Sequence, residues 1–147
     1  MKIRPYRKSD AASLTALVRA LADYQKLPHP TPAAARRLVA DVGRRIHVLI
    51  AEVDGRAVGY AIYFFTYASF RGRPKLYLED LFLLPEHRRG GLGAKFFAEL
   101  CKLAQRAKCA RLEWCVLDWN KPARRFYERL GAKRTSGMST YQLDLRK

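Results

Sequence analysis

The segment at residues 76–97 constrains the fold of this chain more than any other. Residues 76–84, LYLEDLFLL, form a dense apolar run that is interrupted only by Glu79 and Asp80. Such a run is typical of a strand buried on both faces of a sheet. From Leu92 onward, apolar residues recur every three or four positions, which predicts a helix. A strand, a glycine-rich turn and a helix in this order direct backbone N–H groups and the positive end of a helix dipole toward a phosphate.

The glycine turn at residues 88–93 excludes two common phosphate-binding motifs. A Walker motif needs Lys and then Ser or Thr after its second glycine, but Ala94 and Lys95 follow Gly93. A Rossmann motif needs a third glycine where this chain has Phe96. The remaining pattern, Arg-x-x-Gly-x-Gly, resembles the pyrophosphate loop of the GNAT superfamily of acyl-CoA N-acyltransferases. Taken alone, these six residues leave open an ordinary glycine-rich turn before a helix.

Length and composition predict one cytoplasmic domain over residues 1–147. The chain is long enough for one hydrophobic core, and no apolar run approaches the length of a membrane span. Its start lacks the apolar segment of a signal peptide. Three cysteines without a C-x-x-C pair, and three scattered histidines, indicate neither a disulfide framework nor a metal site. They are Cys101, Cys109, Cys115, His29, His47 and His87.

The formal net charge of +16 favours anionic partners. Its densest part, residues 121–134, carries six cations within the C-terminal region. Two interpretations stay open at this point: a generally basic, solvated surface, and a dedicated nucleic-acid site.

Hydrophobic patterning predicts an α/β fold with a mixed, mostly antiparallel sheet flanked by helices. Asp54-Gly55 between two alternating apolar runs indicates a β-hairpin. Strands are expected at residues 2–6, 46–53, 56–67, 76–84, 110–117, 132–135 and 138–145. Helices are expected to begin near Asp10, Thr31, Leu92 and Asn120, where capping residues or first-turn prolines occur.

A second motif follows the glycine loop, at residues 120–132. Its pattern, Asn-x-Pro-Ala-x-x-Phe-Tyr-x-x-x-Gly-Ala, resembles the other signature segment of GNAT enzymes. The resemblance covers nearly the whole chain. Residues 21–24, 58–67, 77–80 and 116–120 are similar to the diamine (spermidine/spermine) and thialysine N-acetyltransferase family. The spelling Val-Leu-Asp-Trp-Asn at 116–120 is closer to the thialysine branch.

The resemblance implies the GNAT fold, with acetyl-CoA in a cleft beside the central strand, and a homodimer. It also implies direct acetyl transfer to a primary amine, without an acyl-enzyme. Attack requires a neutral amine, although alkylamines have a pKa near ~10. In this family a carboxylate takes the proton, and Glu79 matches it; apolar surroundings would raise the pKa of Glu79. Tyr127 matches the residue that protonates the departing thiolate.

The family assigns further positions to its two ligands. Residues expected to bind the cofactor are Leu81, Phe82, Leu83, Arg88, Arg89, Gly90, Gly91, Leu92, Gly93, Ala94, Asn120, Lys121, Pro122 and Ala123. Residues expected at the acceptor are Tyr24, Gln25, Asp80, Glu113, Trp114 and Cys115. The structural alternatives are a salt bridge for Glu79 and a core position beside Phe126 for Tyr127.

The acceptor is where this sequence departs from the polyamine enzymes. They carry an acidic residue where Gln25 stands, and Asp and Trp where this chain has Ala68 and Phe70. Fewer carboxylates and a strongly positive protein weaken the case for a polyamine, so that a monoamine, an amino-acid side chain or a peptide amine stands beside it as an expected acceptor. The alternatives are a protein or peptide N-acetyltransferase and a basic nucleic-acid-associated module that has lost catalysis.

Overall fold

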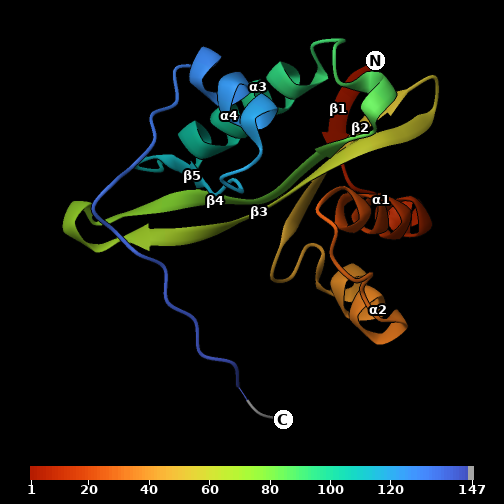
Figure 1. Ribbon diagram of the computed structural model, residues 1–147, viewed down its shortest axis with the longest axis horizontal. Coiled ribbons are helices and arrows are strands. Elements are labelled where there is room, and N and C mark those ends of the chain that lie inside the picture. The colour runs from red at the N-terminus through yellow and green to blue at the C-terminus, as the bar shows by residue number, and fades with distance from the viewer. Residues whose placement is uncertain (146–147) are drawn as a thin grey trace. The chain divides into compact units, whose positions relative to one another are not determined.

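The computed structural model describes residues 1–145, which fall into two compact units, Met1–Cys115 and a second one from Val116 onward. In the first unit, the described strands form a five-stranded sheet in the order β1-β2-β3-β4-β5 (Figure 1). The first four strands are antiparallel, and β5 lies parallel to β4. The prediction of a mixed, mostly antiparallel sheet is therefore confirmed.

Strand and helix bounds follow the predicted pattern closely up to β4. The strands are β1 Lys2–Pro5, β2 His47–Val53, β3 Arg56–Ala68, β4 Arg73–Leu83 and β5 Leu112–Trp114. The helices are α1 Ala11–Tyr24, α2 Pro32–Asp41, α3 Leu92–Arg106 and, in the second unit, α4 Lys121–Arg129. Asp54 and Gly55 both have positive φ, 48° and 75°, which is the backbone that a two-residue hairpin turn requires.

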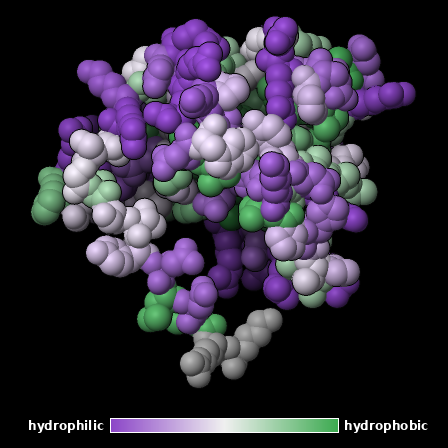
Figure 2. Space-filling view, viewed as in Figure 1, coloured by the Kyte–Doolittle hydropathy of each residue, from purple (hydrophilic) through white to green (hydrophobic). Residues whose placement is uncertain are grey.

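Helices α1 and α3 cover opposite faces of the sheet (Figure 1). On the α1 side, Leu14 and Leu17 pack against Ile50, Tyr60 and other buried residues of β2, β3 and β4. On the other side, α3 buries one stripe of its surface: Leu92, Phe96, Phe97, Leu100 and Ala104. Hydrophilic residues occupy most of the face of the molecule that Figure 2 shows.

Arg4 of the N-terminal strand β1 links this strand to the residue before α1 and to β2 through side-chain hydrogen bonds. Arg4 donates hydrogen bonds to both carboxylate oxygens of Asp10 at 2.8 and 2.9 Å and to Glu52 at 2.6 Å. Asp10 was expected to cap α1, but its side chain instead accepts bonds from Arg4 and from the Arg7 backbone at 2.7 Å. The hydrogen bond from Arg4 holds the pKa of Asp10 below its usual value.

Three strand predictions are wrong. The strand expected at residues 110–117 spans only Leu112–Trp114. Residues 132–135 and 138–145 form no strand in the described chain, although Tyr141, Leu143 and Leu145 alternate with polar residues. An alternating pattern becomes a strand only where a neighbouring strand accepts its backbone hydrogen bonds, and none is paired with these residues.

Candidate active site

A β-bulge in β4 determines how the candidate acceptor residues are presented. Ile62 of β3 is paired with Asp80 and Tyr63 with Leu78, so Glu79 is an extra residue without its own partner. The extra residue shifts the alternation of β4 by one position. Asp80 therefore lies on the face that α1 covers, whereas an unbroken alternation would put it on the face of Leu78.

The Asp80 carboxyl is half-buried on that face. Tyr60, which is fully buried, donates a hydrogen bond from its hydroxyl to Asp80 Oδ2 at 3.2 Å. Burial, and next the negative charge of Glu79, raise the pKa of Asp80 to about 6, against the opposing effect of the Tyr60 hydrogen bond. Asp80 consequently titrates close to neutral pH, where a proton acceptor is useful.

Glu79 differs from its predicted environment. Its side chain is exposed, so the expectation of apolar surroundings for Glu79, and of a β4 buried on both faces there, is wrong. The cause is the bulge, which removes Glu79 from the regular pairing of the strand. The two adjacent carboxyls thus have different environments: Glu79 is exposed and Asp80 is half-buried.

The pairing between β4 and β5 ends where the bulge begins. The paired residues are Leu76 with Leu112, Tyr77 with Glu113 and Leu78 with Trp114. Among the described residues, positions 79–83 of β4 have a strand neighbour only on the β3 side. Backbone groups at such an edge need another partner. Leu81, Phe82 and Leu83, the predicted cofactor-binding residues of β4, all lie in this stretch.

The glycine loop joins β4 to the start of α3. Gly91 is the residue before the first turn of α3 and has φ 78°, a left-handed conformation that favours glycine. Arg89, Gly90, Gly91 and Ala94 are exposed, Gly93 is half-buried and Leu92 is buried under the helix. The loop therefore offers accessible backbone at a helix N-terminus, as an anion site requires.

Arg88 is turned back onto the sheet. Its Nε donates to the Leu83 carbonyl at 2.9 Å, and its guanidinium lies 4.6 Å from the ring centre of Tyr24 and 5.4 Å from that of Phe82. These contacts connect the glycine loop, β4 and the last residue of α1. Gln25 directly follows Tyr24 and is half-buried. The structure thus brings Tyr24 of the acceptor set next to two residues of the cofactor set.

The three acceptor residues predicted at β5 lie on different faces. Trp114 packs against Phe97 of α3, with ring centres 4.9 Å apart. Glu113 and Cys115 lie on the opposite face, where the Tyr77 hydroxyl donates to Cys115 Sγ at 3.3 Å. That bond, with burial and nearby negative charge, raises the pKa of Tyr77 to about 12.

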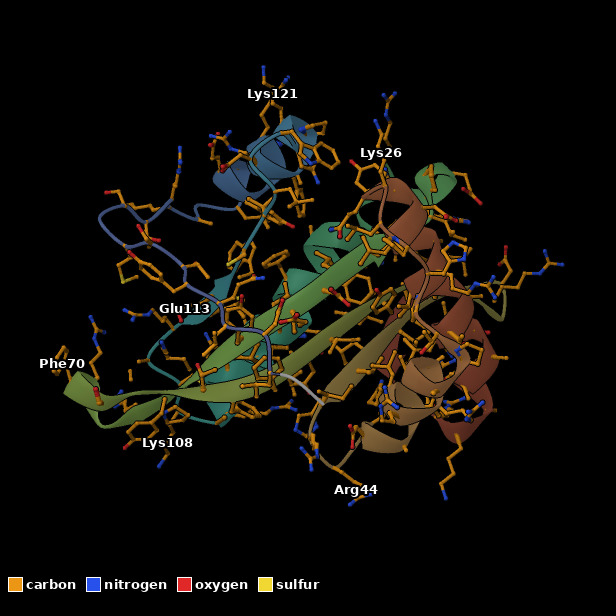
Figure 3. All side chains as sticks on the ribbon, turned by 60° about the horizontal axis from the view of Figure 1, so that its bottom comes forward. Lys26, Arg44, Phe70, Lys108, Glu113 and Lys121 are labelled. Carbon is orange, nitrogen blue, oxygen red and sulfur yellow. The ribbon has the colours of Figure 1, made fainter. Side chains whose placement is uncertain are left out.

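Glu113 is held between two cations. Lys75 Nζ lies 2.9 Å from its Oε1, and Arg111 Nε donates to its Oε2 at 2.8 Å. Partial burial favours a higher pKa, but the bonds from Lys75 and Arg111 outweigh it and lower the pKa of Glu113. Figure 3 shows Glu113 on the sheet, away from the hairpin tip that carries Phe70.

The second unit contains the remaining predicted site residues. Asn120 caps α4 through a hydrogen bond from the Ala123 backbone to its side chain at 3.3 Å, and Lys121 and Pro122 form the first turn. The expected N-cap and first-turn proline are confirmed. Tyr127 lies on the same helix, with its ring centre 5.6 Å from that of Phe126.

Comparison with known proteins identifies the family. The sequence profile of the Acetyltransferase (GNAT) family matches residues 14–132, which include both motifs. This chain belongs to the GNAT acetyltransferase family. A mouse thialysine N-epsilon-acetyltransferase is 34% identical over 143 residues, 90% of this chain and 84% of the relative. An L-ornithine N5-acetyltransferase of Arabidopsis thaliana is 37% identical over 80 residues, 54% of this chain and 35% of the relative.

Solved structures agree on the GNAT fold. The crystal structure of a probable acetyltransferase has a TM-score of 0.87 and 17% sequence identity, and the match covers 100% of this chain and 99% of that one. Together with the relatives, the family match shows that this protein is an N-acetyltransferase.

Two tyrosines of this GNAT site were missed by the sequence analysis. Tyr60 contacts Asp80, and Tyr77 contacts Cys115. The Asp54-Gly55 turn sets only the first pairs between β2 and β3, because the register shifts between Ala51 and Glu52, and the β3–β4 register depends on the bulge at Glu79, which no local pattern marks. In the part of the chain that the structure describes, no group of three or more His, Cys, Asp or Glu side chains could hold a metal ion. No helix there is long and apolar enough to cross a membrane.

Proposed function

We propose that this protein transfers an acetyl group from acetyl-CoA directly to a primary amine of a small molecule. The preferred acceptor in this proposal is a thialysine-like amino acid, with diamines and polyamines as the alternative. The observation that carries it is the bulge in β4. The bulge places the two adjacent carboxyls of Glu79 and Asp80 where the pairing of β4 with β5 ends, in the strand that leads into the glycine loop.

The residues present fit acetyl-CoA. Positions 81–83 lie on an edge of β4 to which an extended, amide-containing chain could hydrogen-bond, and the glycine loop offers backbone N–H groups to a pyrophosphate. Gly91 is suited to this because its backbone is left-handed and nothing lies within 4 Å of where its Cβ would be. When bound, acetyl-CoA supplies the acetyl group and a thiolate leaving group.

The acid–base chemistry is assigned to Glu79, Asp80 and Tyr127. An alkylammonium must lose its proton before it attacks, and the two carboxyls can hold the cation and accept that proton. A carboxyl with a pKa of about 6, as in Asp80, is better matched to proton transfer near neutral pH than an ordinary aspartate. Tyr127 would donate a proton to the departing thiolate. Asn120 to Ala123 would contact the cofactor arm.

The acceptor class is supported by the relatives and by the charges. The relatives are named for thialysine and ornithine, which are both amino acids with a side-chain amine. Gln25 and Ala68 replace charges that would bind the further ammonium groups of a polyamine. A homodimer, as the resemblance implies, and a cytoplasmic location, as predicted from composition, are part of the proposal.

An acetyl-CoA consumption assay over thialysine, lysine, ornithine, putrescine and spermine tests this function. We expect the highest kcat/KM with an amino acid. Tyr127→Phe should lower kcat by ~10²–10⁴-fold without changing the Kd for acetyl-CoA, because only proton donation is lost. The matched control is Tyr141→Phe, since Tyr141 is exposed in the C-terminal segment. No turnover of any of these amines by a protein that binds acetyl-CoA would refute the proposed acceptor class.

A further inference from the structure

On one face of the sheet, the charge of the side chains changes along β4, from the candidate acceptor residues to the hairpin tip. The register places Asp80, Tyr77, Lys75 and Arg73 on the same face of β4, opposite Ile62, Phe64, Thr66 and Ala68 of β3. In β5, Glu113 shares that face because it is paired with Tyr77. From Asp80 toward the hairpin tip, the side chains on this face of β4 therefore change from a carboxyl to neutral Tyr77, beside which Glu113 and Cys115 lie, and then to the cations Lys75 and Arg73.

At the cationic end of this face, ion pairs hold the side chains in a fixed arrangement. Glu113 binds Lys75 and Arg111 simultaneously, so the three side chains together keep one net positive charge. The Lys75 side chain is only 19% exposed, and Lys75 and Arg111 also line a cavity of about 240 Å³ at the tip of the β3–β4 hairpin, together with Arg71. A carboxylate that is already shared by two cations is a poor partner for an ammonium group. Glu113 instead orients Lys75 and Arg111.

The spacing suits a molecule with an amine at one end and an anion at the other. Asp80 and Lys75 are separated by four residue steps of β3, from Ile62 to Thr66, or roughly 13 Å. An extended lysine-like amino acid spans roughly 7–8 Å from its side-chain nitrogen to its carboxyl carbon, by standard bond lengths. The flexible stem of Lys75 can cover the difference. A diamine of the same length would bring a second cation toward Lys75 and Arg111.

We propose that Lys75 and Arg111, oriented by Glu113, bind the carboxylate of the acceptor while Glu79 and Asp80 bind its amine. This proposal rests on the proposed function and specifies its substrate class as zwitterionic amino acids. Lys75 and Arg111 would then be the residues that make the enzyme prefer amino acids to diamines as acceptors.

The test compares two acceptors that differ only in the carboxylate: thialysine, S-(2-aminoethyl)-cysteine, and its decarboxylated form, bis(2-aminoethyl) sulfide. We expect the parent protein to prefer thialysine at least tenfold in kcat/KM. Lys75→Gln and Arg111→Gln should each raise the KM for thialysine about tenfold, leave kcat nearly unchanged and leave the diamine unaffected. Lys75→Arg should retain the preference, because the positive charge is kept.

Lys102→Gln is the matched control. Lys102 pairs with Glu99 on the surface of α3, so its loss changes the net charge equally but not the Glu113 site. It should leave the preference unchanged. Equal use of both acceptors by the parent protein, or equal loss of both in Lys75→Gln and Arg111→Gln, would overturn the carboxylate site while the amine acetyltransferase activity stands. Turnover of neither acceptor would overturn the proposed function as well. Because Arg111 is exposed, Arg111→Gln keeps the test valid if Lys75→Gln fails to fold.

Discussion

At the scale of single residues, Asp80 has the property that the sequence analysis assigned to Glu79. Both carboxyls were placed in an apolar strand, but Glu79 is exposed and only Asp80 is partly buried, beside Tyr60. Because its native-state pKa, about 6, is above the ordinary value of 3.8, the native state holds the proton more tightly than the unfolded chain. Its contribution to stability is fully present below pH 3.8 and is lost as pH rises through about 6.

Asp80→Asn should therefore change the pH dependence of stability. The amide cannot ionise and can still accept the hydrogen bond from Tyr60. We expect the variant to gain stability relative to the parent as pH rises from 4 to 8, by at most about 3 kcal/mol. Thermal unfolding of both proteins across this range measures it. Asp144→Asn, the same change at an exposed position, should give a constant difference. A pH-independent difference for Asp80→Asn would mean that the carboxyl titrates alike in both states.

At the scale of elements, the turn between β4 and α3 is the feature best explained by residues that lie close together in the sequence. Gly91 has φ 78°, and any side chain there strains the backbone although space is available. The strand before it ends in an unpaired edge and the helix after it begins with buried Leu92. Strand edge, loop and helix start are thus joined in one continuous segment.

Gly91→Val should weaken acetyl-CoA binding at least tenfold, because the strained loop can no longer present its N–H groups. Gly43→Val is the control: Gly43 has φ 81° and equally open surroundings, but lies in the turn between α2 and β2. Both variants should lose roughly 1–2 kcal/mol of stability. Titration calorimetry of the folded proteins with acetyl-CoA separates them. An unchanged Kd in folded Gly91→Val would remove the loop from the cofactor site.

At the scale of the whole molecule, the net charge of +16 acts on every charged acceptor. Long-range repulsion slows the approach of a polycation, and salt screens it, since the Debye length falls from ~30 Å at 0.01 M to ~3 Å at 1 M. The contacts of Lys75 and Arg111 are short-range, so the two effects can be distinguished by ionic strength.

The ratio of kcat/KM for thialysine over spermine should be largest at low salt and fall as salt is added. Kinetic measurements with both acceptors at two ionic strengths test this. The parent's preference for thialysine over spermine should persist at high salt because the local site remains. If spermine is favoured more than tenfold at low salt, the local carboxyls outweigh the net charge and this is an ordinary polyamine acetyltransferase.

The sequence by itself determined the family, the two motifs and most element starts. The Asp54-Gly55 turn, the Thr31 and Asn120 caps and the periodicity from Leu92 all depend on residues close together in the chain. Each is therefore readable before any tertiary contact forms.

Only the tertiary structure decided which of the two carboxyls is less exposed, where β5 ends and whether residues 132–145 form strands. These features depend on pairing between distant segments. The bulge at Glu79 arises from the register of β4 against β3, and it moves Asp80 onto the α1 face and ends the β5 pairing at Leu78. A single extra residue in a strand reverses the direction of every side chain beyond it, and no local pattern in the sequence records where that residue is placed.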